Sequence, residues 1–306
     1  MNLRIEFIDT IQRIFGERGR EWLPRLPSIV AQCRRKWGLH ESRICTALSI
    51  NYIEFATTTT GEAVALKVGV PHAELFTEMA ALRLYAGQGA VRLLDTDLNL
   101  GAILMQRVQP GNVLWSLGDN DEETRIAAEV MRQIAQPVPA DHTFPLFSEW
   151  VERAFRLTRT TWDPQERMPR HLISAAEVAF SEIERTKSTD VVLHGDLHHE
   201  NIVFDQQAGW LAIDPKGVIG APCLEVGRFL HNQLPTHLSI AQRQALVRAR
   251  LRILSSELGY SQEILAASGL VDCVLGHCWC FEDAALGPYW HLGIELAESL
   301  TRMAGI

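Results

Sequence analysis

The sequence lacks any apolar run that approaches the roughly 20 residues of a membrane-spanning helix. Its first residues, Met1 to Glu6, include an acidic residue and no long apolar core, so we expect no secretory signal. Cysteine is also scarce, because the six cysteines lie at irregular spacing, which indicates free thiols in a reducing compartment. Together these features predict a cytoplasmic protein that does not enter membranes.

Long Ser/Gly linkers, internal repeats and low-complexity tracts are absent as well. The 306 residues are enough for two lobes with a large core, and their 47% hydrophobic content is ordinary for a globular protein. The net charge of −8 argues against nucleic acid as a partner and favours a cationic small molecule, because an acidic cleft concentrates cations. Nothing in the composition decides the oligomeric state.

The cysteines nearest to a metal-binding pattern are Cys273, Cys278 and Cys280, with His277 among them. They lie in an apolar, helix-like segment, and no matching second pair exists. Buried thiols therefore explain this run better than a zinc site.

Residues 194–203, which read HGDLHHENIV, carry the strongest chemical pattern in the chain. Asn201 follows Asp196 by five residues, and Asp214 follows Asn201 by thirteen. A carboxylate can orient an attacking hydroxyl and accept its proton, and Mg²⁺ prefers hard oxygen ligands. This order of a base and two metal ligands is typical of kinase-like phosphotransferases, with Asp196 as the base and Asn201 and Asp214 as the ligands.

The apolar residues around this pattern predict how its side chains converge. We expect short strands at 191–193, 202–204 and 210–213, with a turn at 205–209 between the last two. Asp196 would then lie on a loop between strands, and Asn201 and Asp214 near the two ends of one hairpin. A polar surface loop is the alternative, but three matched roles would then be coincidence.

A kinase also needs a lysine on an upstream strand, paired with a glutamate on the next helix. Residues 63–68 form an alternating strand that contains Lys67 and resembles the Val-Ala-Ile-Lys strand of kinases. The helix expected at 73–86 carries Glu74 and Glu78, and we favour Glu78 as the partner of Lys67 because it lies further along the helix. Glu74 remains the alternative.

The remaining nucleotide contacts rest on weaker patterns. There is no Gly-x-Gly-x-x-Gly loop between the strands expected at 44–49 and 53–57, so the side chains of Ser49 or Asn51 would have to meet the phosphates. The missing Gly-x-x-x-x-Gly-Lys-Ser/Thr segment excludes a P-loop NTPase as far as that motif goes. After the strand at 102–105, the backbone of Gln106 and Val108 would pair with the adenine edge.

The elements divide the chain into three regions. An apolar stripe predicts a helical extension at residues 1–40, and strands with one helix predict a nucleotide-binding lobe at 41–108. Residues 109–306 read as mainly helical and would bind the substrate and catalyse its reaction. The fold class expected is α+β, in a bilobal protein-kinase-like arrangement with a hinge near 106–111.

These motifs resemble the aminoglycoside phosphotransferases, and more narrowly the streptomycin 6-phosphotransferase group of aminoglycoside/hydroxyurea resistance kinases. HGDLHHENIV and residues 209–217, which read GWLAIDPKG, carry the resemblance, and residues 89–94 and 279–283 add to it. It implies ATP and Mg²⁺ as cofactors, Asp196 as the catalytic residue, Asn201 and Asp214 as metal ligands and Lys67 as the phosphate lysine. His198 would donate to the γ-phosphate or simply pack, and Lys216 would touch a phosphate or lie on the surface.

The acceptor contacts are expected in the last third of the chain. Glu282 and Asp283 follow Trp279 and Phe281 and could bind a guanidinium or ammonium group. Glu225 is a further candidate for the substrate site, with orientation of the catalytic loop as its other role.

We therefore expect an ATP-dependent kinase that phosphorylates a hydroxyl of an aminoglycoside, with streptomycin as the first choice. A kinase for another alcohol, of the hydroxyurea, choline, homoserine or fructosamine type, is the alternative. A nucleotide-binding pseudokinase scaffold is a third hypothesis, and a Mg²⁺-dependent ATPase signal would exclude it.

Overall fold

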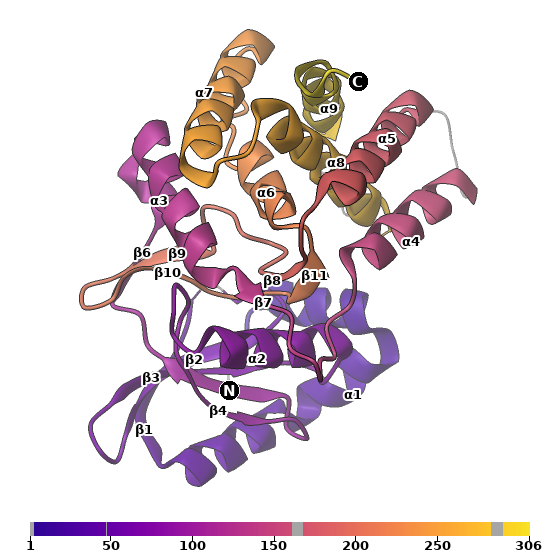
Figure 1. The fold of residues 1–306 in the computed structure, drawn as a ribbon. Helices are drawn as coiled ribbons and strands as arrows, with labels where there is room; N and C mark the ends of the chain where they lie inside the picture. Colours follow the sequence, from indigo (N-terminus) through magenta and orange to yellow (C-terminus); the bar gives the residue numbers. More distant parts are fainter. Residues whose placement is uncertain (1–2, 47, 161–167, 283–289) are drawn as a thin grey trace. The chain divides into compact units, whose positions relative to one another are not determined.

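The computed structural model describes residues 3–46, 48–160, 168–282 and 290–306 (Figure 1). The chain forms two compact units, residues 1–109 and residues 110–306. The first is built on an antiparallel sheet, and the second is mainly helical, which confirms the α+β class expected from the sequence.

The first unit is a five-stranded sheet with one helix before its first strand and a second helix between its third and fourth strands. Its elements are α1 (Ile5–Trp37), β1 (Leu39–Ile44), β2 (Tyr52–Thr58), β3 (Ala63–Val68), α2 (Ala73–Tyr85), β4 (Leu93–Asp97) and β5 (Ala102–Gln106). The strands lie in the order β1-β2-β3-β5-β4, and every neighbouring pair is antiparallel. β3 is therefore the central strand, which places Lys67 in the middle of the sheet.

Helix α1 shares one hydrophobic core with the sheet. It bends at Gly16, whose φ of 57° and ψ of −127° are not helical, and it continues to Trp37. The apolar side of the helix buries Phe7, Ile11, Trp22 and Leu26 in the same cluster as side chains of β2, β3 and β5. Burial of each such side chain contributes about 1.5–3 kcal/mol, so α1 is part of the first unit's core.

The first strand lies earlier than the sequence pattern predicted. We expected a strand at 44–49, but β1 ends at Ile44, and the chain then turns until β2 begins at Tyr52. Only Leu39 of β1 is fully buried, because β1 is an edge strand with a mostly polar sequence. Its weak hydrophobic alternation is the physical reason why the pattern missed it.

The second unit combines two small sheets with a group of helices. Its strands are β6 (Pro110–Val113), β7 (Gln136–Pro137), β8 (Val191–Leu193), β9 (Ile202–Asp205), β10 (Gly209–Ala212) and β11 (Val218–Gly220). They form the antiparallel sheets β10-β9-β6 and β11-β8-β7. The helices are α3 (Asn120–Ile134), α4 (Phe147–Thr160), α5 (Arg170–Thr186), α6 (Val226–His231), α7 (Ile240–Leu258), α8 (Gln262–Glu282) and α9 (Trp290–Ala304), with short 3-10 turns at Leu114–Leu117 and Pro222–Glu225.

Helix α8 is the central helix of this unit and packs against α4, α5, α6, α7 and α9 (Figure 1). Its segment Gln262–Cys280 is long and apolar enough to cross a membrane by length and composition. The expectation that no apolar run reaches that length was therefore wrong. The helix is apolar on all sides because 72% of this segment is buried inside the protein.

Candidate active site

The catalytic loop connects β8 to β9 and is held by hydrogen bonds of its own histidine. The backbone N–H of Asp196 donates to Nδ1 of His194 over 3.2 Å, and Nε2 of His194 lies 2.8 Å from the carbonyl oxygen of Ile213. Burial lowers the pKa of His194 to about 4, although the hydrogen bond to Ile213 opposes this shift. His194 is therefore neutral, with its proton on Nε2, and it ties the loop to the chain just before Asp214.

Gly195 is required by the shape of this loop. Its φ is +77°, in the left-handed region that other residues rarely adopt, and a Cβ there would lie 2.8 Å from Cγ1 of Val218. Any side chain at this position would displace the backbone that leads into Asp196.

Glu225 supports the same loop through two hydrogen bonds to its backbone. Its Oε2 accepts the N–H of His194 over 2.6 Å, and its Oε1 accepts the N–H of Gly195 over 3.2 Å. Burial raises the pKa of Glu225 to about 7, although both backbone donors oppose the shift. The side chain is buried and both oxygens are engaged, so Glu225 orients the loop. These contacts fit its other expected role, orientation of the catalytic loop, and a contact of Glu225 with the substrate stays a prediction.

Asn201 and Asp214 present the oxygens that a divalent cation would need. Nδ2 of Asn201 donates to the carbonyl of Asp196 over 2.9 Å, which leaves Oδ1 as the ligand atom of the amide. The N–H of Ile213 donates to the carbonyl of Asn201 over 2.9 Å and so brings Asp214 next to Asn201. Asp214 has a φ of +59°, a conformation that non-glycine residues adopt mainly where the surrounding structure requires it. One amide and one carboxylate oxygen fit Mg²⁺.

In the first unit, Lys67 forms the ion pair that the sequence favoured. Its Nζ lies 2.7 Å from Oε1 of Glu78, and both side chains are buried. Glu74, the alternative partner, lies on the exposed face of α2. The buried pair holds the ammonium group on the central strand, and its role toward phosphates stays a prediction.

The weaker nucleotide-binding candidates differ in how the structure presents them. Ser49 is exposed, whereas Asn51 is buried with its Oδ1 packed against Gly69, so Ser49 fits a phosphate contact better. The N–H of Gln106 donates to the carbonyl of Arg92 over 2.9 Å, so a contact between Gln106 and an adenine edge would fall to its carbonyl oxygen. Val108 is half-buried after β5.

The other candidates in the second unit are His198, Lys216 and two acidic residues. Nδ1 of His198 accepts the N–H of Glu200 over 3.3 Å, and burial lowers the pKa of His198, so its Nε2 carries the proton. The N–H of Lys216 donates to the carbonyl of His194 over 2.8 Å. Asp283 and the side chain of Glu282 lie outside the described residues.

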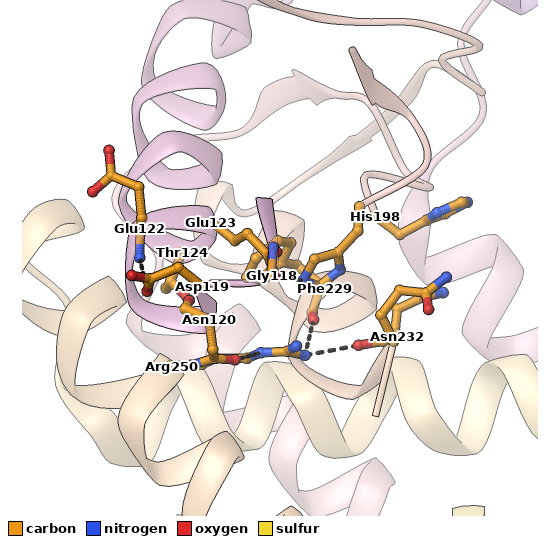
Figure 2. A network of polar contacts seen from close by, with 12 residues as sticks. Gly118, Asp119, Asn120, Glu122, Glu123, Thr124, His198, Phe229, Asn232 and Arg250 are labelled. Carbon is orange, nitrogen blue, oxygen red and sulfur yellow. Dashed lines mark hydrogen bonds and ion pairs between the residues drawn. The ribbon is translucent and has the colours of Figure 1, made fainter. Parts of the chain in front are cut away.

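Figure 2 shows a buried network of polar contacts around Arg250, which no pattern in the sequence predicted. Arg250 of α7 donates to the carbonyls of Phe229 (3.0 Å), Leu230 (3.1 Å) and Asn232 (2.7 Å), and to Oδ1 of Asn120 (2.8 Å). A cation at the carboxyl end of a helix satisfies carbonyls that have no helical partner. Burial lowers the pKa of Arg250 to about 10, so the guanidinium stays charged at neutral pH.

His199 lies between this network and the loop. Its ring stacks on Phe229 with centroids 4.1 Å apart, and neither ring nitrogen has a hydrogen-bond partner. Burial lowers its pKa to about 2, so the 3.8 Å approach of Oε2 of Glu123 is a contact with a neutral imidazole, not an ion pair. His199 therefore acts as an apolar side chain that fixes the loop on α6.

The chain is similar in sequence to known kinases and phosphotransferases. The family described as aminoglycoside/hydroxyurea antibiotic resistance kinase matches residues 38–284. The chain is 28% identical to streptomycin 6-kinase of Streptomyces griseus, over 96% of this chain and 95% of the relative. It is 30% identical to hydroxyurea phosphotransferase of Kitasatospora aureofaciens, over 98% of this chain and 86% of the relative.

Solved structures share the fold at lower identity. A choline kinase from Streptococcus pneumoniae superposes with a TM-score of 0.64 at 14% identity, over 91% of this chain and 99% of that one. Aminoglycoside phosphotransferase APH(4)-Ia, solved with ADP and hygromycin B, superposes with a TM-score of 0.61 at 16% identity, over 90% of this chain and 98% of that one. The fold is that of the protein-kinase-like phosphotransferases, as the sequence predicted.

Proposed function

Because the chain belongs to the aminoglycoside/hydroxyurea antibiotic resistance kinase family, we propose that it transfers the γ-phosphate of ATP to a hydroxyl of streptomycin. The observation that carries this proposal is the catalytic loop, in which Asp196, Asn201 and the residue before Asp214 are joined by hydrogen bonds. The similarity to a streptomycin 6-kinase over nearly the whole chain and the net charge of −8 support a cationic aminoglycoside as the acceptor.

Each residue of the proposed site has a defined task. Asp196 orients the acceptor hydroxyl and takes its proton late in the step, as the oxygen bonds to the γ-phosphorus and the bond to the β–γ bridging oxygen breaks. Oxygens of Asn201 and Asp214 would hold Mg²⁺, which when bound neutralises charge on the phosphates. Lys67, fixed by Glu78, would hold the phosphates on the α/β side. The products are a phosphate ester and ADP.

Hydroxyurea is a second candidate acceptor, because a hydroxyurea phosphotransferase is 30% identical over 98% of the chain. Hydroxyurea is small and uncharged, whereas streptomycin carries guanidinium groups. The two acceptors therefore make different demands on acidic side chains, and Glu282 and Asp283 remain candidates for the cationic groups.

The proposal is tested by coupled ADP release with ATP and Mg²⁺ against streptomycin, kanamycin, hydroxyurea, choline and homoserine. We expect turnover with streptomycin, and Asp196→Asn should abolish it while ATP binding persists, because the substitution keeps the shape and removes the base. The exposed Glu200→Gln in the same loop is the matched control and should retain full turnover. Turnover with hydroxyurea alone would show that hydroxyurea, and not streptomycin, is the acceptor. ATP binding without ADP release in the presence of any acceptor would indicate a scaffold.

A further inference from the structure

Arg228 of α6 lies between the catalytic aspartate and a second carboxylate. Its Nε is 3.2 Å from Oδ1 of Asp196 and 3.3 Å from Oδ2 of Asp272, which lies in α8. Neither contact has the alignment of a hydrogen bond, so both are ion pairs governed by charge and distance. The Arg228 side chain is only 18% exposed, so little solvent screens these contacts.

The neighbours of Arg228 fix its guanidinium from several sides. Asp272 is itself held by Nε2 of His231, 2.6 Å from its Oδ2. The ring of Trp279 lies under the guanidinium with its centroid 5.9 Å away, a distance at which a cation–π attraction operates.

Two glycines make room for this arrangement. A Cβ on Gly227 would lie 2.6 Å from Cβ of Asp272, so only glycine permits α6 to approach α8 this closely. A Cβ on Gly276 would lie 3.1 Å from Nη1 of Arg228, against the guanidinium itself. The position of the cation is therefore set by the packing of α6 on α8 and does not depend on a flexible surface side chain.

The charges of the cluster stabilise one another. Burial alone would lower the pKa of Arg228, but the carboxylates of Asp272 and Asp196 outweigh it and raise that pKa. Burial would likewise raise the pKa of Asp272, but Arg228 and His231 outweigh it and lower that pKa. Both groups are charged at neutral pH, and the two carboxylates offset part of the cost of burying the guanidinium.

We propose that Arg228 is a positioning residue for phosphoryl transfer, which holds Asp196 by Oδ1 and leaves Oδ2 to meet the acceptor hydroxyl. The inference rests on the proposed role of Asp196 as the residue that orients that hydroxyl. Asp272 acts one step further away by fixing Arg228. The chemical step depends on orientation to a fraction of an ångström, so the loss of Arg228 should act on kcat.

Two other roles for Arg228 make different predictions. If the guanidinium bound the nucleotide phosphates, its loss would raise the KM for ATP in proportion to the loss of activity. If it only tied α6 to α8, its loss would lower the fraction of folded protein and leave kcat per folded molecule unchanged.

The test uses steady-state kinetics of the full chain with four variants: Arg228→Ala, Arg228→Lys, Asp272→Asn and, as a matched control, Arg243→Ala. Arg243 is also buried and ion-paired, with Glu295 3.3 Å away, but it is remote from the loop in sequence. Folded protein is quantified by circular dichroism, and kcat and the KM for ATP are measured with whichever acceptor the wild-type enzyme turns over. The choice of acceptor tests the proposed function, and the variants test Arg228.

We expect Arg228→Ala to lower kcat about 100-fold with the KM for ATP within about twofold of wild type, because misplacement of a reacting group costs this much. Guanidinium ion at millimolar concentration should restore part of this loss, and it should not restore Asp196→Asn. Arg228→Lys and Asp272→Asn should lose about tenfold each, and the control should keep wild-type kcat.

Three results would overturn the inference: kcat within about threefold of wild type in folded Arg228→Ala, a KM for ATP that rises as activity falls, or no rescue by guanidinium. If Arg228→Ala does not fold, the kcat values of Arg228→Lys and Asp272→Asn test the inference instead. A wild-type kcat in both variants would contradict the positioning role of Arg228.

Discussion

At the scale of single residues, the catalytic loop is held by hydrogen bonds of the buried side chains of Glu225 and His194. Glu225 accepts two backbone N–H groups of the loop, and His194 links the loop to the chain before Asp214. A carboxylate that accepts N–H donors in a buried place forms strong bonds, because little water competes for them. The position of Asp196 is thus set by a buried histidine of the loop itself and by a buried glutamate from another segment.

Glu225→Gln tests this support. The amide offers one acceptor oxygen, and its NH₂ group would face a second N–H donor, so we expect kcat to fall about tenfold or more at an unchanged KM for ATP. The exposed Glu257→Gln, which loses only its surface ion pair with Arg132, should leave kcat unchanged. Wild-type kcat in folded Glu225→Gln would show that the loop does not depend on this carboxylate.

The residues predicted from sequence were those whose chemical type and spacing form a pattern. Lys67 and Glu78 lie on a strand and the following helix, so local periodicity was enough to pair them. Arg228 and Asp272 could not be found this way, because their ion pair depends on how α6 packs on α8, and the two residues are 44 positions apart along the chain. Asn51 looked like a loop donor because the sequence does not reveal that its side chain packs inward on Gly69.

At the scale of elements, α6 is a short helix that connects the catalytic loop to the helical part of the second unit. Glu225 precedes it, Arg228 lies within it, and the carbonyls at its end are bound by Arg250 of α7 (Figure 2). A six-residue helix has little stability of its own, so tertiary contacts must hold it. The sequence predicted a mainly helical region here, and Pro222 begins the 3-10 turn before α6, a position where a missing N–H leaves no helical hydrogen bond unmade.

Arg250→Met tests the contribution of this contact. It would leave three buried carbonyls without their donor, so we expect the free energy of unfolding to fall by roughly 3 kcal/mol. Arg248→Met is the matched control, because Arg248 lies exposed on the same helix and its loss should change stability by no more than about 0.5 kcal/mol. Equal denaturation midpoints for the two variants in urea would refute the role of Arg250.

At the scale of the whole molecule, buried histidines link stability to pH. Burial lowers the pKa of His199 from an ordinary value of 6.5 to about 2 in the folded protein. Below pH 6.5 His199 is therefore protonated in the unfolded chain and stays neutral in the folded protein. Stability from this group is complete above pH 6.5 and is lost as the pH falls. His194, with a pKa of about 4, acts in the same direction, and Glu225, with a pKa raised to about 7, acts in the opposite one.

His199→Leu isolates one of these contributions. From pH 6.5 to about pH 5 the variant should lose about 2 kcal/mol less stability than the wild type, since one displaced proton is worth about 1.4 kcal/mol per pH unit. Urea denaturation at each pH measures this difference, and His237→Leu, a substitution at an exposed position, should leave the wild-type dependence intact. Parallel pH profiles for wild type and His199→Leu would show that His199 is not held neutral.

The measurement that tests the central claim most directly is mass spectrometry of streptomycin after incubation with the enzyme, ATP and Mg²⁺. The proposed function predicts that the antibiotic gains one phosphate, that ADP forms in equal amount, and that Asp196→Asn produces neither. Unmodified streptomycin in the presence of active, ATP-binding enzyme would contradict the proposed acceptor. Phosphorylated streptomycin from Asp196→Asn at the wild-type rate would contradict the proposed site.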